Sequence, residues 1–396
     1  MALEKAVRRN IDRFIQAFNT ETRIALKSRS IHWLGWLWPL LLFLLIGSIF
    51  RAGTLLDMPI AVVDNDHSSL SRQIVREMDA ASHARVQRQE YDLQEGLRGI
   101  QEADQYSLLY IPRDFEADGL AGKQPRAVLY YNGLFYSAGY YSTQDFPGLM
   151  VQINNTYRSR LTAGAGQPVP PLASITVSQE NLFNASGNYI YYQQFAAMVH
   201  LLQMFVIVTT IHVLACEAPE LRSLARHVLR GRGLLARLLG KLAPYTLLFT
   251  TLLLLQIFLL VVLNGARIKG SPVWMIAICF CYVMAAQSVG MLLFSLTSHR
   301  LNAYTLVGLL VGIAQTYSGL LLPELAMPEI ARVIGTVEPL THAMRGLFDQ
   351  FLREAPAASG LVYCGQLLTY PLIIGLTVRR RLPKRLNLHP AAETSS

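Results

Sequence analysis

The chain has few charged residues for its length. Asp, Glu, Lys and Arg make up 15% of 396 residues, whereas hydrophobic residues make up 52%. Ordinary soluble proteins carry about 25% charged residues, so this composition points away from a purely soluble protein. Charge is missing from six apolar runs, each close to the ~20 residues that cross a bilayer as a helix. The six predicted spans are Ile31 to Phe50, Phe195 to Ala215, Leu242 to Leu263, Val273 to Leu296, Leu301 to Leu322, and Leu361 to Val378.

Cysteine is also scarce, and its placement is uneven. All four cysteines lie in or at the ends of predicted spans, and the polar segment 51–193 has none. A polar segment of that size without cysteine neither uses nor risks disulfides, which suits a bacterial periplasm. Cys279 and Cys281 are one residue apart, which is not a metal-binding spacing. We expect apolar packing from them.

The motifs of an enzyme are missing as well. Gly240-Lys241 is not a phosphate loop, because no glycine stands five residues before Gly240 and Leu242 replaces the Ser or Thr that would meet magnesium. The predicted spans hold neither a His-Glu-x-x-His pair nor paired carboxylates, so a membrane-embedded enzyme is the least favoured interpretation. We expect no cofactor on this chain.

The net charge of +9 reports orientation rather than nucleic-acid binding. Lys and Arg outnumber Asp and Glu in segments 1–30, 217–241 and 379–396, while acids outnumber bases in segment 51–193. This is the positive-inside pattern, with both termini in the cytoplasm and the acidic segment on the other side of the membrane. We therefore expect no nucleic-acid partner.

Segment 51–193 alternates between strand and helix patterns. A strand from Met58 ends in a turn at Asp64 to Asp66, and further strands and helices follow. This alternation predicts one α/β domain outside the membrane. Asp64, Asp66 and His67 allow a metal site, although a helix cap is the commoner role for such residues. The expected strands are Ala84 to Gln89, Tyr106 to Ile111, Arg126 to Tyr131 and Ile175 to Ser178, and the expected helices are Ser68 to Met78, Asp92 to Glu102, Pro112 to Leu120 and a long stretch to about Leu161.

The fifth apolar run is followed by a proline-punctuated segment, 323–353. Proline removes a backbone donor and biases the preceding residue away from helix, so this segment turns back at the membrane face. The order Ser318-Gly319, Pro323, Met327-Pro328 and Glu338-Pro339-Leu340-Thr341 resembles the permease subunits of type-2 ABC exporters. The resemblance implies re-entrant helices at the outer mouth of a translocation path, with Gly319, Pro323, Pro328 and Pro339 at their turns.

The same resemblance extends over nearly the whole chain. Pro59-Ile-Ala-Val-Val-Asp64 and Leu108-Leu-Tyr-Ile-Pro112 look like the first extracytoplasmic domain of the larger family members. The fold class expected is a membrane all-α bundle of six transmembrane helices with an inserted periplasmic α/β domain. Its parts are a cytoplasmic amphipathic helix 1–30, a first transmembrane helix 31–50, the periplasmic domain 51–193, a five-helix domain 194–378 with a cytoplasmic loop 217–241, and a basic tail 379–396.

Two groups of candidate residues follow. In the family, the loop after the second span contacts the ATPase, which assigns coupling to Glu217, Glu220, Arg222, Arg226, Gly240 and Lys241. Leu221-Arg222 and Arg230-Gly231 depart from the family pattern, which allows pairing with a different permease. Polar side chains within the spans either line a path or hydrogen-bond neighbouring helices. The path candidates are His200, Gln203, Gln287, Gln315 and Tyr317, and Gln256 is a further amide.

The expected function is that of a permease subunit of an ATP-driven exporter in the bacterial inner membrane. By resemblance, ATP and magnesium bind to separate ATPase subunits, and a second permease chain, identical or paralogous, packs alongside. An amphipathic, lipid-like or drug-like substrate leaves the cytoplasm or inner membrane. A periplasmic adaptor and membrane lipid are further expected partners. The alternative is a non-transporting scaffold that presents the periplasmic domain to an efflux adaptor.

Overall fold

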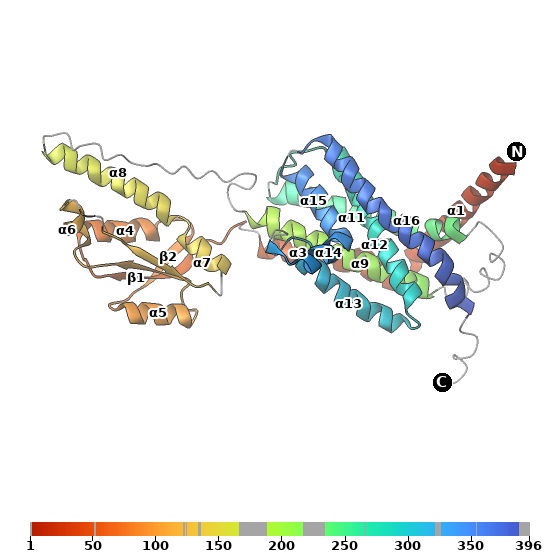
Figure 1. Ribbon diagram of the computed structural model, residues 1–396, viewed down its shortest axis with the longest axis horizontal. Coiled ribbons are helices and arrows are strands. Elements are labelled where there is room, and N and C mark those ends of the chain that lie inside the picture. Colours follow the sequence, from red (N-terminus) through yellow and green to blue (C-terminus); the bar gives the residue numbers. More distant parts are fainter. Residues whose placement is uncertain are drawn as a thin grey trace. The chain divides into compact units, whose positions relative to one another are not determined.

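The computed structural model describes residues 2–50, 53–121, 123, 125–133, 136–165, 188–216, 234–264, 266–320, 326–353 and 355–387. The chain divides into two compact units. One comprises Met1–Arg51 with Asn181–Ser396, and the other comprises Ala52–Glu180. The first is helical and the second is an α/β unit (Figure 1).

The α/β unit contains a four-stranded sheet in the order β2-β1-β3-β4. Strand β1 pairs in parallel with β2 and β3, and β4 runs antiparallel to β3. The strands are β1 (Met58–Asp64), β2 (Ala84–Gln89), β3 (Ser107–Ile111) and β4 (Val128–Tyr131), and the helices are α4 (Ser69–Asp79), α5 (Leu93–Gln101), α6 (Phe115–Leu120), α7 (Tyr136–Thr143) and α8 (Phe146–Ala165).

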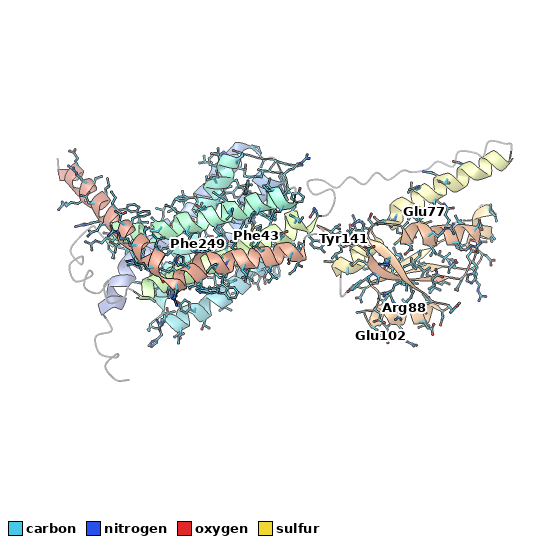
Figure 2. The ribbon with its side chains drawn as sticks, turned by 180° about the vertical axis from the view of Figure 1, so that it is seen from behind. Phe43, Glu77, Arg88, Glu102, Tyr141 and Phe249 are labelled. Carbon is cyan, nitrogen blue, oxygen red and sulfur yellow. The ribbon has the colours of Figure 1, made fainter. Side chains whose placement is uncertain are left out.

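Strand β1 is apolar on both faces because helices cover both. Val62 packs with Ile74 of α4 and Ile153 of α8 on one face. Val63 packs with Ile100 of α5 on the other face. Figure 1 shows α5 across the sheet from α4 and α8. Charged side chains such as those of Glu77, Arg88 and Glu102 are exposed (Figure 2).

The α/β architecture expected from the sequence is present, with shifted boundaries. The third helix begins at Phe115 instead of Pro112, because Asp114 takes a left-handed conformation with φ of 60°. The long helical stretch breaks into α7 and α8 at a turn at residues 144–145, and Pro147 lies in the first turn of α8, where its missing backbone N–H is tolerated. The strand expected at 175–178 lies outside the described residues.

The helical unit packs around α12, which contacts α9, α11, α13, α15 and α16. Phe43 on α3 and Phe249 on α11 are among its buried side chains (Figure 2). The elements are α1 (Ala2–Lys27), α2 (Arg29–His32), η1 (Trp33–Leu37), α3 (Trp38–Ile49), η2 (Ile190–Gln194), α9 (Phe195–Cys216), α11 (Leu234–Asn264), α12 (Pro272–Leu296), α13 (Arg300–Tyr317), α14 (Glu329–Val337), α15 (Pro339–Phe351) and α16 (Ala357–Asn387), where η marks a π-helical turn.

Five described helices are long and apolar enough to cross a membrane. They are Arg29–Ile49, Phe195–Ala215, Leu234–Leu263, Pro272–Leu296 and Ala358–Arg381. The remaining predicted span corresponds to α13, which has 18 residues and ends at Tyr317. Gly319 has a φ of 84°, so the chain turns earlier than the apolar run suggests. At 1.5 Å per residue α13 is about 27 Å long, slightly shorter than a typical hydrocarbon core. The sixth span therefore stays a prediction.

Candidate functional site

A helical hairpin, α14 and α15, lies between α13 and α16 in the chain. Pro328 caps the start of α14. Pro339 opens α15, and Glu338 before it has an extended backbone with φ of −88° and ψ of 125°. Proline disfavours helix at the residue before it, so the chain must turn at Glu338. The segment thus turns after α13 and again at Glu338. Pro323 lies outside the described residues.

The two helices of the hairpin differ in burial. Helix α15 packs against α9, α12 and α16, and Leu340, Leu347 and Phe351 are fully buried. Helix α14 leaves Ile330 and Val337 exposed, yet Gly335 lies so close to the end of α13 that a Cβ atom would overlap the carbonyl oxygen of Tyr317. The hairpin is therefore held by close backbone packing at one end and by the bundle core at the other.

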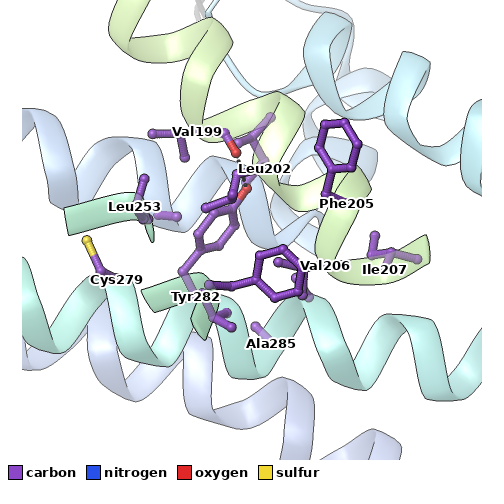
Figure 3. Close-up of a cluster of buried hydrophobic side chains, with 14 of the residues drawn as sticks. Val199, Leu202, Phe205, Val206, Ile207, Leu253, Cys279, Tyr282 and Ala285 are labelled. Carbon is purple, nitrogen blue, oxygen red and sulfur yellow. Dashed lines mark hydrogen bonds between the residues drawn. The ribbon is translucent and has the colours of Figure 1, made fainter. Parts of the chain in front are cut away.

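The turn of the hairpin is tied to the bundle by a buried polar network. The Nε2 atom of Gln203 on α9 donates a 2.6 Å hydrogen bond to Oε1 of Glu338. The hydroxyl of Tyr282 on α12 lies 3.2 Å from Oε1 of Gln203 and 3.2 Å from the carbonyl oxygen of Val199. Figure 3 shows Tyr282 reaching from α12 towards Val199 through apolar side chains. The network connects three elements at one point.

Glu338 is 7% exposed and lies outside the five apolar spans. Within the described part of the chain, no cationic side chain forms an ion pair with it. Burial raises the pKa of Glu338 to about 7, although the hydrogen bond from Gln203 and one from the Leu340 backbone oppose the shift. Its carboxyl group can therefore gain or lose a proton near neutral pH.

The path candidates are dispersed among different contacts. His200 lies one turn before Gln203 on the same helix and is 5% exposed, and its Nδ1 atom has no hydrogen-bond partner among the described residues. Gln287 accepts from Thr246 at 2.8 Å and donates to the Leu242 carbonyl at 3.2 Å, so it joins α12 to α11. Gln315 and Tyr317 are half-buried near the end of α13, and Gln256 donates only a long 3.5 Å bond, to Pro39.

The coupling candidates that the structure describes pack against α1. Lys241 donates a 2.6 Å hydrogen bond to Oε2 of Glu21, and Tyr245 donates one of 2.5 Å to Oε1. A Cβ atom at Gly240 would overlap the carbonyl oxygen of Phe14, so a side chain there would push α1 away. Glu217, Glu220, Arg222 and Arg226 lie outside the described residues.

Residues 29–378 match the family model described as "ABC-2 family transporter protein". The match runs from the first apolar helix into the last and includes the α/β unit. The chain belongs to the ABC-2 transporter family. A comparison with curated proteins gives no match. As an ABC-2 protein with five candidate spans, the chain is a multi-pass membrane permease subunit of an ABC transporter and works with ABC ATPase subunits.

The sequence of this ABC-2 protein does not identify two of the buried hydrogen-bond partners described above: Glu338, which binds Gln203, and Glu21, which binds Lys241. The sequence presents Glu338 only as part of the Glu-Pro-Leu-Thr motif, and it places Glu21 on the predicted cytoplasmic amphipathic helix 1–30. An acid that follows an apolar face at helical spacing, as Glu21 does, was the available signal for burial. In the α/β unit, Asp64 accepts hydrogen bonds from the backbone of Asp66 and His67 and from the Ser71 hydroxyl. Asp64 therefore stabilises the turn before α4.

Proposed function

We propose that this ABC-2 chain is the membrane subunit of an exporter, energised by separate ATPase subunits that bind ATP and magnesium. It moves an amphipathic, lipid-like or drug-like substrate out of the cytoplasm or inner membrane. The hairpin anchored at Glu338 carries the proposal, because the position of its turn depends on contacts with α9 and, through Gln203, with α12. A non-transporting scaffold would not need a buried carboxyl group at the turn of this hairpin.

The proposed orientation rests on charge. Segments 1–30, 217–241 and 379–396 are basic and stand on the cytoplasmic side, which requires α13 to complete a sixth span. The acidic α/β unit then faces the periplasm, and α14 and α15 lie at the outer mouth of the path. The inner membrane of a bacterium is the proposed location.

The proposed movement starts at the cytoplasmic ends of α1 and α11. Gly240, Lys241 and Glu21 fasten these two helices together, so a push on loop 217–241 moves both. Helix α11 is joined to α12 through Gln287. The hydroxyl of Tyr282 on α12 bonds Gln203 of α9, which in turn bonds Glu338 at the turn of the hairpin. Closure of the ATPases would thus change the position of the hairpin through contacts that are continuous in the structure.

Two permease chains, identical or paralogous, are proposed to stand side by side above two ATPases. A periplasmic adaptor that receives substrate from the α/β unit is a further proposed partner. The second candidate function is a scaffold that presents the α/β unit to an efflux adaptor without moving substrate itself. The buried, unpartnered Nδ1 atom of His200 and the Glu338 network favour transport over this scaffold.

The experiment is transport in proteoliposomes that contain the chain and its cognate ATPase. Fluorescent phospholipids and amphipathic dyes serve as probes, and an ATPase variant that binds but does not hydrolyse ATP is the matched control. We expect ATP-dependent movement of at least one probe, lost with the control. Stimulation of the ATPase without movement of any probe, in vesicles where the ATPase is active, would favour the scaffold.

A further inference from the structure

A cavity of about 370 Å³ lies in the α/β unit. Parallel strands β1 and β2 end beside it, and α4 forms a second wall. In open sheets with parallel strands, ligands bind outside the carboxyl ends of the strands, most often where the strand order reverses; this cavity lies at that edge of the sheet, beside β1 and β2. The volume falls within the range of small-molecule sites, about 300–1,000 Å³. Its polar lining includes Asp64, His67, Arg72, Arg76, Glu90 and Tyr91.

The turn at the base of this cavity is already fixed. Asp64 accepts bonds of 3.0 Å and 3.1 Å from the backbone of Asp66 and His67, and one of 2.8 Å from the Ser71 hydroxyl. His67 itself takes a φ of 52°. Because three donors already bind the Asp64 carboxylate, its oxygen atoms have little remaining capacity to bind a ligand, and Asp64 mainly fixes the shape of the cavity.

Two guanidinium groups form the cationic wall. Arg72 and Arg76 stand one turn apart on α4, so they share a face. Nη1 of Arg72 donates a 2.5 Å hydrogen bond to the carbonyl oxygen of His67, which orients one edge of its guanidinium. Among the described residues neither arginine forms an ion pair. Guanidinium groups bind carboxylate and phosphate oxygens in pairs, so this wall suits an anion.

The part of the lining contributed by the chain after β2 carries the opposite charge. Glu90 follows β2, and its backbone N–H is fixed by a 2.9 Å bond to the Val62 carbonyl. Tyr91 next to it is 91% exposed, which leaves an aromatic face at the rim for a cation. A simple anion between the arginines would meet the Glu90 carboxylate. A ligand with an ammonium group beside its anionic group would match both walls.

We propose that this cavity binds a small zwitterion in which a phosphate group stands next to an ammonium group. Phosphoethanolamine has this chemistry, either as a free molecule or as a lipid headgroup. The anion lies between Arg72 and Arg76, and the ammonium lies against Glu90 and Tyr91. The site belongs to the α/β unit alone and does not depend on transport.

The test is calorimetric titration of the full-length chain in detergent. Phosphoethanolamine, inorganic phosphate and ethanolamine are the probes, and glycerophosphoethanolamine represents the lipid headgroup. We expect phosphoethanolamine to bind about tenfold more tightly than either half, since each charged wall contributes a separate contact. Tighter binding of glycerophosphoethanolamine would assign the site to a lipid headgroup, and tighter binding of phosphoethanolamine to a free ligand.

Three variants make the test specific. Arg76→Gln removes an exposed side chain that forms no ion pair among the described residues, so the fold should stay intact, and it should weaken binding of phosphoethanolamine about tenfold. Glu90→Gln should remove the preference for phosphoethanolamine over inorganic phosphate. Arg85→Gln makes the same charge change on exposed β2, outside the cavity lining, and should change nothing. No binding of phosphoethanolamine to the unaltered chain, or equal weakening by Arg76→Gln and Arg85→Gln, would overturn the proposal.

Discussion

Lys241 on α11 and Glu21 on α1 form a buried ion pair, with 2.6 Å between Nζ and Oε2. Glu21 is 3% exposed and Lys241 is 6% exposed. Tyr245 binds the second carboxylate oxygen, so both oxygens of Glu21 have donors. Helix α1 is therefore fastened to α11, the third apolar helix, so the two helices should move together.

Breaking this pair from one side should be costly. Lys241→Met leaves the Glu21 carboxylate buried without its cation, which typically destabilises a protein by about 3–5 kcal/mol. Replacing both residues, as Glu21→Leu with Lys241→Met, should restore much of the stability. Thermal unfolding of the purified chain in detergent measures both effects. Lys123→Met disrupts an exposed pair with Asp118 and is the control, expected to leave the unfolding temperature unchanged. Equal losses in the single and double variants would contradict the buried-pair account.

Glu338 should make stability depend on pH. Its pKa is raised from 4.5 to about 7 in the folded chain, so folding favours the protonated form. The stabilising contribution is therefore fully present below about pH 4.5 and is lost as pH rises through about 7. Glu338→Gln resembles the protonated form and keeps an oxygen that can accept from Gln203. We expect unfolding temperatures of the unaltered chain to fall between about pH 4.5 and pH 7 and to level off above that, and those of Glu338→Gln to change less. The same pH dependence in both proteins would refute the assignment.

Features that depend on local residue patterns could be predicted from the sequence, whereas contacts between residues far apart in the chain could not. Strand β2 occupies the predicted residues, Ala84 to Gln89, and β1 was recognisable from its apolar run because local pattern determines them. Gln203 and Glu338 are 135 residues apart, and no periodicity could bring them together. Gln287, like Gln203, is a glutamine within an apolar helix, yet its side chain faces α11 and accepts a hydrogen bond from Thr246. Which polar side chains bond each other within a helix bundle is determined by tertiary packing.

The close approach of α14 to α13 gives a matched pair of glycine substitutions. Gly335→Ala should clash with the carbonyl oxygen of Tyr317 and cost about 1–3 kcal/mol. Gly312→Ala on α13 meets no atom within 4 Å and should be neutral or gain up to ~1 kcal/mol of helix propensity. Thermal unfolding compares the two. Transport should fall with Gly335→Ala alone, and equal behaviour of both variants would mean that the hairpin tolerates displacement.

The acids at the start of loop 217–241 should affect ATP hydrolysis. Replacing Glu217 and Glu220 with glutamine is expected to lower the ATPase activity of the reconstituted complex several-fold, towards that of the ATPase alone, because the coupling contact loses its charge. Glu329→Gln, an exposed acid on α14, is the matched control. Unchanged hydrolysis after the double replacement would defeat the coupling assignment.

The sidedness of the two units tests the central claim most directly, because export as proposed needs the α/β unit outside and both termini inside. Lys123→Cys places a thiol on an exposed position of the α/β unit, where the chain has no cysteine, and Ser396→Cys places one at the C-terminal end. The unaltered chain gives the background from its own cysteines. In spheroplasts, a membrane-impermeant maleimide should label Lys123→Cys at once and Ser396→Cys only after lysis. Labelling of Ser396→Cys from outside, or of Lys123→Cys only after lysis, would contradict the account.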